Sequence, residues 1–89
     1  MGYEYQLRYA SPDPAGAADI LRRLPTAVER PDGFDFRSQA DPAGWPDATA
    51  SVDADGIVFC DYRGGEGWRV LGELVAHLAA YGPVTVEEL

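Results

Sequence analysis

Residues 60–68, with the sequence CDYRGGEGW, place one cysteine directly before a glycine-rich stretch, a combination that could bind phosphate or support nucleophilic chemistry. A P-loop needs a lysine that reaches the phosphates, and the chain contains no lysine. A dinucleotide fingerprint needs the spacing Gly-x-Gly-x-x-Gly, whereas Gly65, Gly67 and Gly72 match only its first interval. We therefore interpret this stretch as a strand-to-helix turn in which glycines permit positive φ.

Cys60 could act as a nucleophile if a base lay beside it, and His77 is the only histidine. The predicted place of Cys60, in the middle of a strand and facing inward, favours a buried and unreactive thiol. His77 lies near the end of a predicted helix, where the helix dipole favours a cation. We expect no catalytic pair and no catalytic residue elsewhere in the chain.

The acidic motif DADG at residues 53–56 resembles part of a calcium-binding loop. With Asp53 and Asp55 at its third and fifth positions, Tyr62 would stand where the loop requires a bidentate glutamate. A β-hairpin turn with Gly56 in the left-handed position explains the motif better. We therefore predict neither a metal site nor a cofactor.

The composition limits the partners that the protein can bind. Seven arginines against 15 acidic residues give a net charge of −8 and a pI of about 4.3. This charge disfavours nucleic acid and anionic membranes and favours a basic protein partner. With a single cysteine, no signal peptide and no apolar run of membrane-spanning length, we expect a cytoplasmic protein. Arginine without lysine, together with abundant alanine, glycine, aspartate and proline, is typical of a GC-rich bacterial genome.

Two elements near the N-terminus have clear sequence signals. Residues 3–10 alternate apolar and polar side chains, as in a strand with one buried face. The next segment predicts a helix with Asp13 as its N-cap, Pro14 as its first residue and Pro25 directly after its end.

The middle of the chain predicts a strand at 34–39 and a hairpin within 49–63. A three-residue turn would set Asp53 opposite Ile57 and so decide which side chains of the hairpin are buried. We expect the inward set to be Ala48, Ala50, Val52, Val58, Cys60 and Tyr62. The outward set is then Thr49, Ser51, Ile57, Phe59 and Asp61, because the reverse arrangement would bury Asp61 without an evident partner.

A final helix is predicted from about Gly67 to Tyr81, followed by Gly82 and Pro83. Residues 84–89 favour an edge strand, with a short capped helix as the alternative. The elements predict one α+β domain over residues 1–89, in the order β-α-β-β-β-α with or without a last strand. Its antiparallel sheet has four or five strands, with both helices packed on one face.

The predicted outward side chains suggest a binding surface. Ile57 and Phe59 would form an exposed apolar pair, and Trp45 lies on a proline-bracketed loop between Asp41 and Asp47. The candidate binding residues are Trp45, Asp41, Asp47, Ile57, Phe59 and Asp61. The leading hypothesis is a small acidic protein-interaction module: a homodimer through the open sheet face, or an inhibitor or immunity-type protein that binds a basic partner.

Three alternatives remain open at the level of sequence. Trp45 could fold back onto Ile57 and Phe59 within the same chain. The protein could be a structural subunit of a larger assembly. It could also bind a small molecule, or act as an enzyme, through a pocket between the sheet and the last helix; the residues expected to line it are Tyr5, Tyr9, Tyr62 and Trp68.

Overall fold

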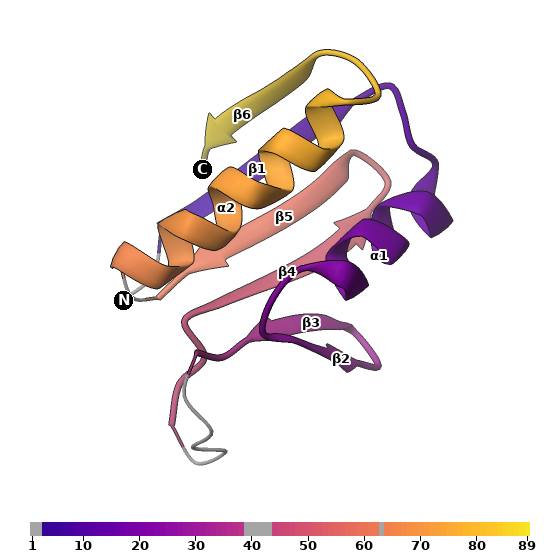
Figure 1. The fold of residues 1–89 in the computed structure, drawn as a ribbon. Helices are drawn as coiled ribbons and strands as arrows, with labels where there is room; N and C mark the ends of the chain where they lie inside the picture. Colours follow the sequence, from indigo (N-terminus) through magenta and orange to yellow (C-terminus); the bar gives the residue numbers. More distant parts are fainter. Residues whose placement is uncertain (1–2, 39–43, 63) are drawn as a thin grey trace.

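The structure is a computed structural model that describes residues 3–38, 44–62 and 64–89. Six strands and two helices follow one another along the chain (Figure 1). Their bounds are β1 Tyr3–Tyr9, α1 Pro14–Arg23, β2 Ala27–Arg30, β3 Gly33–Phe36, β4 Ala48–Asp53, β5 Gly56–Asp61, α2 Gly64–Ala79 and β6 Val84–Glu88.

The strands form one antiparallel sheet in the order β2-β3-β4-β5-β1-β6. Both helices lie on the same side of this sheet (Figure 1), and we call the uncovered side the open face. The α+β class is confirmed, but the sheet has six strands where four or five were expected. Among the described residues, no helix has both the length and the apolar character needed to cross a membrane.

β1 and α1 follow the sequence predictions. On β1, Tyr5 and Leu7 are buried beneath the helices. At the start of α1, the carboxylate of Asp13 accepts a hydrogen bond of 2.8 Å from the amide of Gly16, and Pro14 is the first helical residue. The Asp13 cap and the Pro14 start are both confirmed.

β2 is the strand that the sequence analysis missed. It has only four residues, lies at the sheet edge and pairs with β3 alone, so it shows no long apolar alternation. The chain enters β2 through Thr26, which has a φ of 65°. Because β-branched residues rarely adopt this left-handed conformation, the turn is not apparent from residue types.

The predicted register of the β4–β5 hairpin is wrong. Asp53 pairs with Gly56, so the turn contains only Ala54 and Asp55, and Val52 pairs with Ile57. A slip of one residue turns every side chain of a strand to the other face. Consequently Ile57, Phe59 and Asp61 face the helices, whereas Val58, Cys60 and Tyr62 face the opposite way.

Local contacts explain the shorter turn. The Asp53 carboxylate accepts a hydrogen bond of 2.9 Å from the amide of Asp55 and closes the turn. Gly56 has a φ of 138°, and a Cβ at this position would collide with the carbonyl of Leu7 on β1. Glycine is therefore required at the strand entry, not at the third turn position.

The expectation that Asp61 stays outside also proves wrong. Its side chain is only 1% exposed and lies against Gly67, in the first turn of α2. The N-terminal end of a helix stabilises a negative charge, which makes burial of this carboxylate compatible with folding. α2 begins at Gly64, three residues before the predicted start, and Gly67 leaves the space that Asp61 occupies.

Candidate functional site

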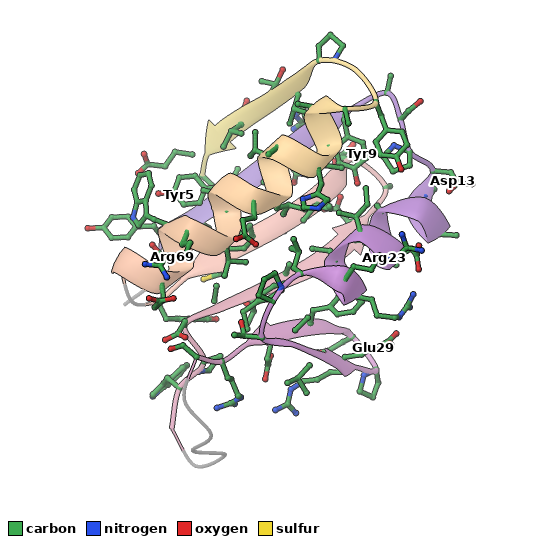
Figure 2. The ribbon with its side chains drawn as sticks, in the orientation of Figure 1. Tyr5, Tyr9, Asp13, Arg23, Glu29 and Arg69 are labelled. Carbon is green, nitrogen blue, oxygen red and sulfur yellow. The ribbon has the colours of Figure 1, made fainter. Side chains whose placement is uncertain are left out.

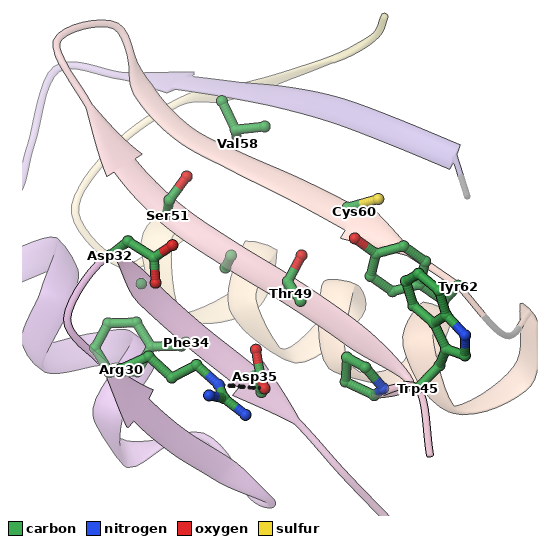
Figure 3. Close-up of a pocket in the computed structure, with 13 residues that line it drawn as sticks. Arg30, Asp32, Phe34, Asp35, Trp45, Thr49, Ser51, Val58, Cys60 and Tyr62 are labelled. Carbon is green, nitrogen blue, oxygen red and sulfur yellow. Dashed lines mark hydrogen bonds and ion pairs between the residues drawn. The ribbon is translucent and has the colours of Figure 1, made fainter. Parts of the chain in front are cut away.

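A groove of about 520 Å³ lies on the open face of the sheet, over β3, β4 and β5 (Figure 3). The hairpin between β2 and β3 contributes one wall, and the segment before β4 contributes the other. The lining side chains with binding chemistry include Arg30, Asp32, Trp45, Ser51, Cys60 and Tyr62.

A polar row crosses the open face of the sheet, and three of its side chains, those of Asp35, Thr49 and Cys60, form the floor of the groove. Glu4 pairs with Cys60, Cys60 pairs with Thr49, and Thr49 pairs with Asp35, so these four side chains point to the same face. Such a floor is more polar than the apolar pair that was expected on this face.

The hydroxyl group of Tyr62 points toward Cys60 and Thr49 in the groove (Figure 3). Its hydrogen bond to the Cys60 side chain is the main cause that raises the pKa of Tyr62, because the bond favours the protonated phenol. The hydrogen bond with Thr49 acts in the opposite direction on this pKa, and burial raises it further. Tyr62 is thus a neutral, oriented phenol at physiological pH.

Trp45 is the most exposed aromatic side chain that the structure describes, at 72%. Its ring lies 5.5 Å from that of Tyr62, with 45° between the ring planes, at one end of the groove. The alternative that Trp45 covers Ile57 and Phe59 is wrong, because both of those side chains are fully buried on the helix side.

A charged cluster surrounds Asp35 on β3, which lines the groove. The Arg30 Nε atom lies 2.5 Å from Oδ2 of Asp35, as the dashed line in Figure 3 marks, and Arg37 Nη2 lies 3.4 Å from the same oxygen. Arg37 also donates a hydrogen bond of 2.7 Å to the carbonyl of Gly44, next to Trp45. This bond ties the segment that carries Trp45 to the sheet.

Asp47, a predicted binding residue, is buried. Its carboxylate accepts a hydrogen bond of 2.7 Å from the amide of Ser38, and its carbonyl accepts one of 2.9 Å from the amide of Tyr62. Asp47 therefore holds the base of the loop in place. Asp41 lies outside the residues that the structure describes.

The predicted site residues are thus only partly brought together. Ile57, Phe59 and Asp61 face the core on the helix side and do not reach the groove. Of the five predicted site residues that the structure describes, Trp45 is the one that lines the groove as an exposed side chain, while buried Asp47 accepts a hydrogen bond from the amide of Ser38.

The Cys60 and His77 side chains lie on opposite sides of the sheet. Cys60 lines the groove on the open face. His77 is exposed on α2, where its Nδ1 lies 2.8 Å from the carbonyl of Glu73. A direct proton transfer between the two is therefore impossible in this fold. Within residues 3–38, 44–62 and 64–89, no group of three His, Cys, Asp or Glu side chains could hold a metal ion.

The predicted aromatic pocket between the sheet and the last helix does not form as expected. Tyr62 is on the open face, while Tyr5 and Tyr9 lie near opposite ends of α2 (Figure 2). Tyr5 and Trp68 make an edge-to-face contact with ring centroids 6.2 Å apart. Burial, and then the charges of Glu88 and Asp61, raise the pKa of Tyr5.

Cys60 and Tyr62 were expected on the helix side because the predicted pairing placed β5 one residue out of register, whereas Thr49 was expected on the open face and lies there. A signal was present in the side chains themselves. Isoleucine and phenylalanine lose more exposed apolar area on burial than valine and cysteine, so the larger pair belonged in the core.

Comparison with known protein families, with curated proteins and with solved structures finds no match to this chain.

Proposed function

We propose that the protein is a small protein-interaction module that binds a basic partner protein on its open face, with Trp45 as the anchor. The observation that carries this proposal is the 72% exposure of Trp45 beside Tyr62, at the end of a groove on an uncovered sheet. Tryptophan and tyrosine are enriched among the residues that dominate binding energy at protein interfaces.

The charges around the groove favour a basic partner. Arg30 and Arg37 both form ion pairs with Asp35, whose single negative charge offsets half of their positive charge. Glu4, which is beside Cys60 on the open face, and Asp32 on the groove wall add negative charge, and the whole chain has a net charge of −8. A positive surface would be steered to this face, and its association would slow as salt screens the field. An inhibitor or immunity-type protein directed at a basic enzyme is one class that fits this description.

Affinity capture from extracts of the native organism tests the proposal. Wild type, Trp45→Ala and Trp68→Ala serve as baits; Trp68 is the matched control because it is also exposed but lies on α2, on the helix side. We expect wild type and Trp68→Ala to retain the same basic protein. With the purified partner, Trp45→Ala should weaken binding roughly 30-fold, as loss of about 2 kcal/mol at a hot spot does.

A partner that binds Trp45→Ala as tightly as wild type, but fails to bind Trp68→Ala, would place the interface on the helix side and reject the proposal. An affinity that does not fall between low and high salt would reject the electrostatic part of it.

Small-molecule binding is a second candidate function that the groove favours. Its volume of about 520 Å³ lies within the range of ligand pockets, and the hydroxyl groups of Thr49, Ser51 and Tyr62 converge on it. A ligand at a hundred times its dissociation constant would stabilise the fold by about 2.7 kcal/mol in a thermal-shift screen. Tyr62→Phe should abolish that shift, whereas a broad metabolite library without any hit would remove this candidate.

A further inference from the structure

In the part of the chain that the structure describes, no strand pairs with the outer edge of β6. β6 is the last strand of the sheet and pairs with β1 on one side only. The amide of Leu89 donates a hydrogen bond of 2.9 Å to the carbonyl of Glu4, which fixes the alternation along this antiparallel pair. Thr85 and Glu87 therefore direct their amide and carbonyl groups toward β1. The same groups of Val84, Val86 and Glu88 point outward, where a further strand could pair with them.

We propose that β6 pairs antiparallel with β6 of a second copy of this chain, around a two-fold axis at Val86. In this register Val86 faces Val86 of the second copy, and Val84 faces Glu88 of the second copy, so all outward amides and carbonyls find partners. The arrangement satisfies the requirement of a two-fold interface, in which one surface must be complementary to itself.

Exposed apolar side chains gather along the same edge. Val86 is 42% exposed and lies in the middle of β6, and Leu89 is exposed at its end. Trp68, 57% exposed, contacts Tyr5, whose neighbour on β6 is Glu88. In the dimer, Glu88 would face Val84 of the second copy. Trp68 contacts the neighbour of Glu88, so the second copy would cover the Trp68 side chain as well. Trp68 and Val86 would thus lose exposed apolar area on pairing.

Charge is compatible with this register and disfavours the neighbouring one centred on Glu87. Around Val86, Glu87 faces Thr85 of the second copy and Glu88 faces Val84, so no carboxylate lies directly opposite another. Moving the axis by one residue to Glu87 would place two copies of that glutamate face to face, an unfavourable cross-strand pair. Each copy has a net charge of −8, so repulsion between the two copies limits the affinity. Salt screens this repulsion and should therefore strengthen the dimer. Two short edge strands form an interface at the low end of the usual area, about 1,000 Å², which indicates a weak dimer.

The dimer would have two grooves on the same side. A two-fold axis between antiparallel edge strands runs perpendicular to the sheet, so the open faces of both copies point the same way. The groove lies over β3, β4 and β5, away from β6, and stays uncovered. A partner with repeated basic segments could then engage both copies at once, with a gain in effective concentration.

Sedimentation equilibrium on the full chain tests the proposal, over protein concentrations from about 10 to 500 µM. The mass of wild type should rise toward twice 9.6 kDa, and should rise further in about 1 M salt. Val86→Pro removes the outward amide without breaking a bond to β1, and edge strands tolerate proline at such positions. It should weaken dimerisation at least about tenfold, while Val86→Thr, which keeps the amide and the branched shape, should dimerise nearly as wild type does.

Hydrogen exchange on wild type provides a readout that does not depend on a variant. The amides of Val84, Val86 and Glu88 should exchange more slowly as protein concentration rises, while that of Ala54, at the hairpin turn, should not change. A wild-type mass of 9.6 kDa throughout the concentration range in high salt would overturn the proposal. A dimer that survives Val86→Pro but is lost in Trp45→Ala would also overturn it, and would place self-association at the groove. If the proposal holds, Trp45→Ala dimerises normally and Val86→Pro still binds the basic partner.

Discussion

Gly67 on α2 offers the most informative single substitution, because its effect depends on where β5 places Asp61. In an ordinary helix interior, Gly→Ala stabilises by about 1 kcal/mol. A Cβ on Gly67, however, would collide with Oδ1 and Cγ of Asp61 and lie 3.1 Å from the carbonyl of Asp47. Asp61 is 1% exposed, so a Cβ on Gly67 would meet a buried side chain and not a flexible one in solvent.

The magnitude follows from these two opposing effects. Overpacking a buried site costs about 1–3 kcal/mol, and the obstacle here is a buried carboxylate backed by main chain. We therefore take a cost at the top of this range, about 3 kcal/mol, and subtract the gain of about 1 kcal/mol in helix propensity, so Gly67→Ala should lower the free energy of unfolding by about 2 kcal/mol. For a domain of this size, such a loss lowers Tm by roughly 8–16 °C.

Gly72 on the same helix is the matched control. A Cβ there meets nothing within 4 Å, and the position is exposed. Gly72→Ala should therefore stabilise by about 1 kcal/mol. Urea unfolding of both variants measures the difference. If Gly67→Ala stabilises as much as Gly72→Ala does, Asp61 does not lie against α2 and the facing of β5 described above is wrong.

Three other expectations concern single sites. Thr26→Gly should raise the free energy of unfolding by up to about 1 kcal/mol in urea titrations, since Thr26 has a φ of 65° and glycine adopts this conformation without strain; a loss of stability would contradict the strained turn. The pKa values of Tyr62 and Tyr5 are raised above the usual 10.0, so their contribution to stability is complete below that pH and is lost as pH rises through the higher native values. Thermal scans should accordingly show Tm falling as the pH rises above about 10, less steeply in Tyr62→Phe. Asp13→Ala should cost about 1 kcal/mol in the same urea assay, because the amide of Gly16 loses its cap; an unchanged midpoint would show that the cap does not stabilise α1.

Local signals predicted several elements well. The alternation of β1 and the capped start of α1 both depend on neighbouring residues, and both are found as expected. β6 also forms at the residues where an edge strand was favoured. These elements are determined by residue propensity and periodicity over a few neighbouring residues, which the sequence shows directly.

The predicted register of the β4–β5 hairpin was wrong because the length of the turn, two residues or three, is decided by contacts outside the hairpin. Gly56 serves a close approach to Leu7 on β1, which sequence spacing does not reveal. The prediction that Asp61 faces outward was wrong for a related reason, because the burial of this side chain depends on the first turn of α2. Of the glycines after Asp61, Gly67 leaves the space that this carboxylate fills, whereas a Cβ on Gly65 would meet nothing within 4 Å, so the glycine-rich stretch did not reveal the contact. The groove followed from the corrected register and so could not be predicted from the sequence.

Chemical-shift mapping on the ¹⁵N-labelled protein, titrated with its captured basic partner, tests most directly whether the open face is the binding surface. We expect the largest changes at the indole N–H of Trp45 and at the amides of Thr49, Ser51, Cys60 and Tyr62. Changes confined to α1 and α2, with the Trp45 signal unmoved, would contradict the account.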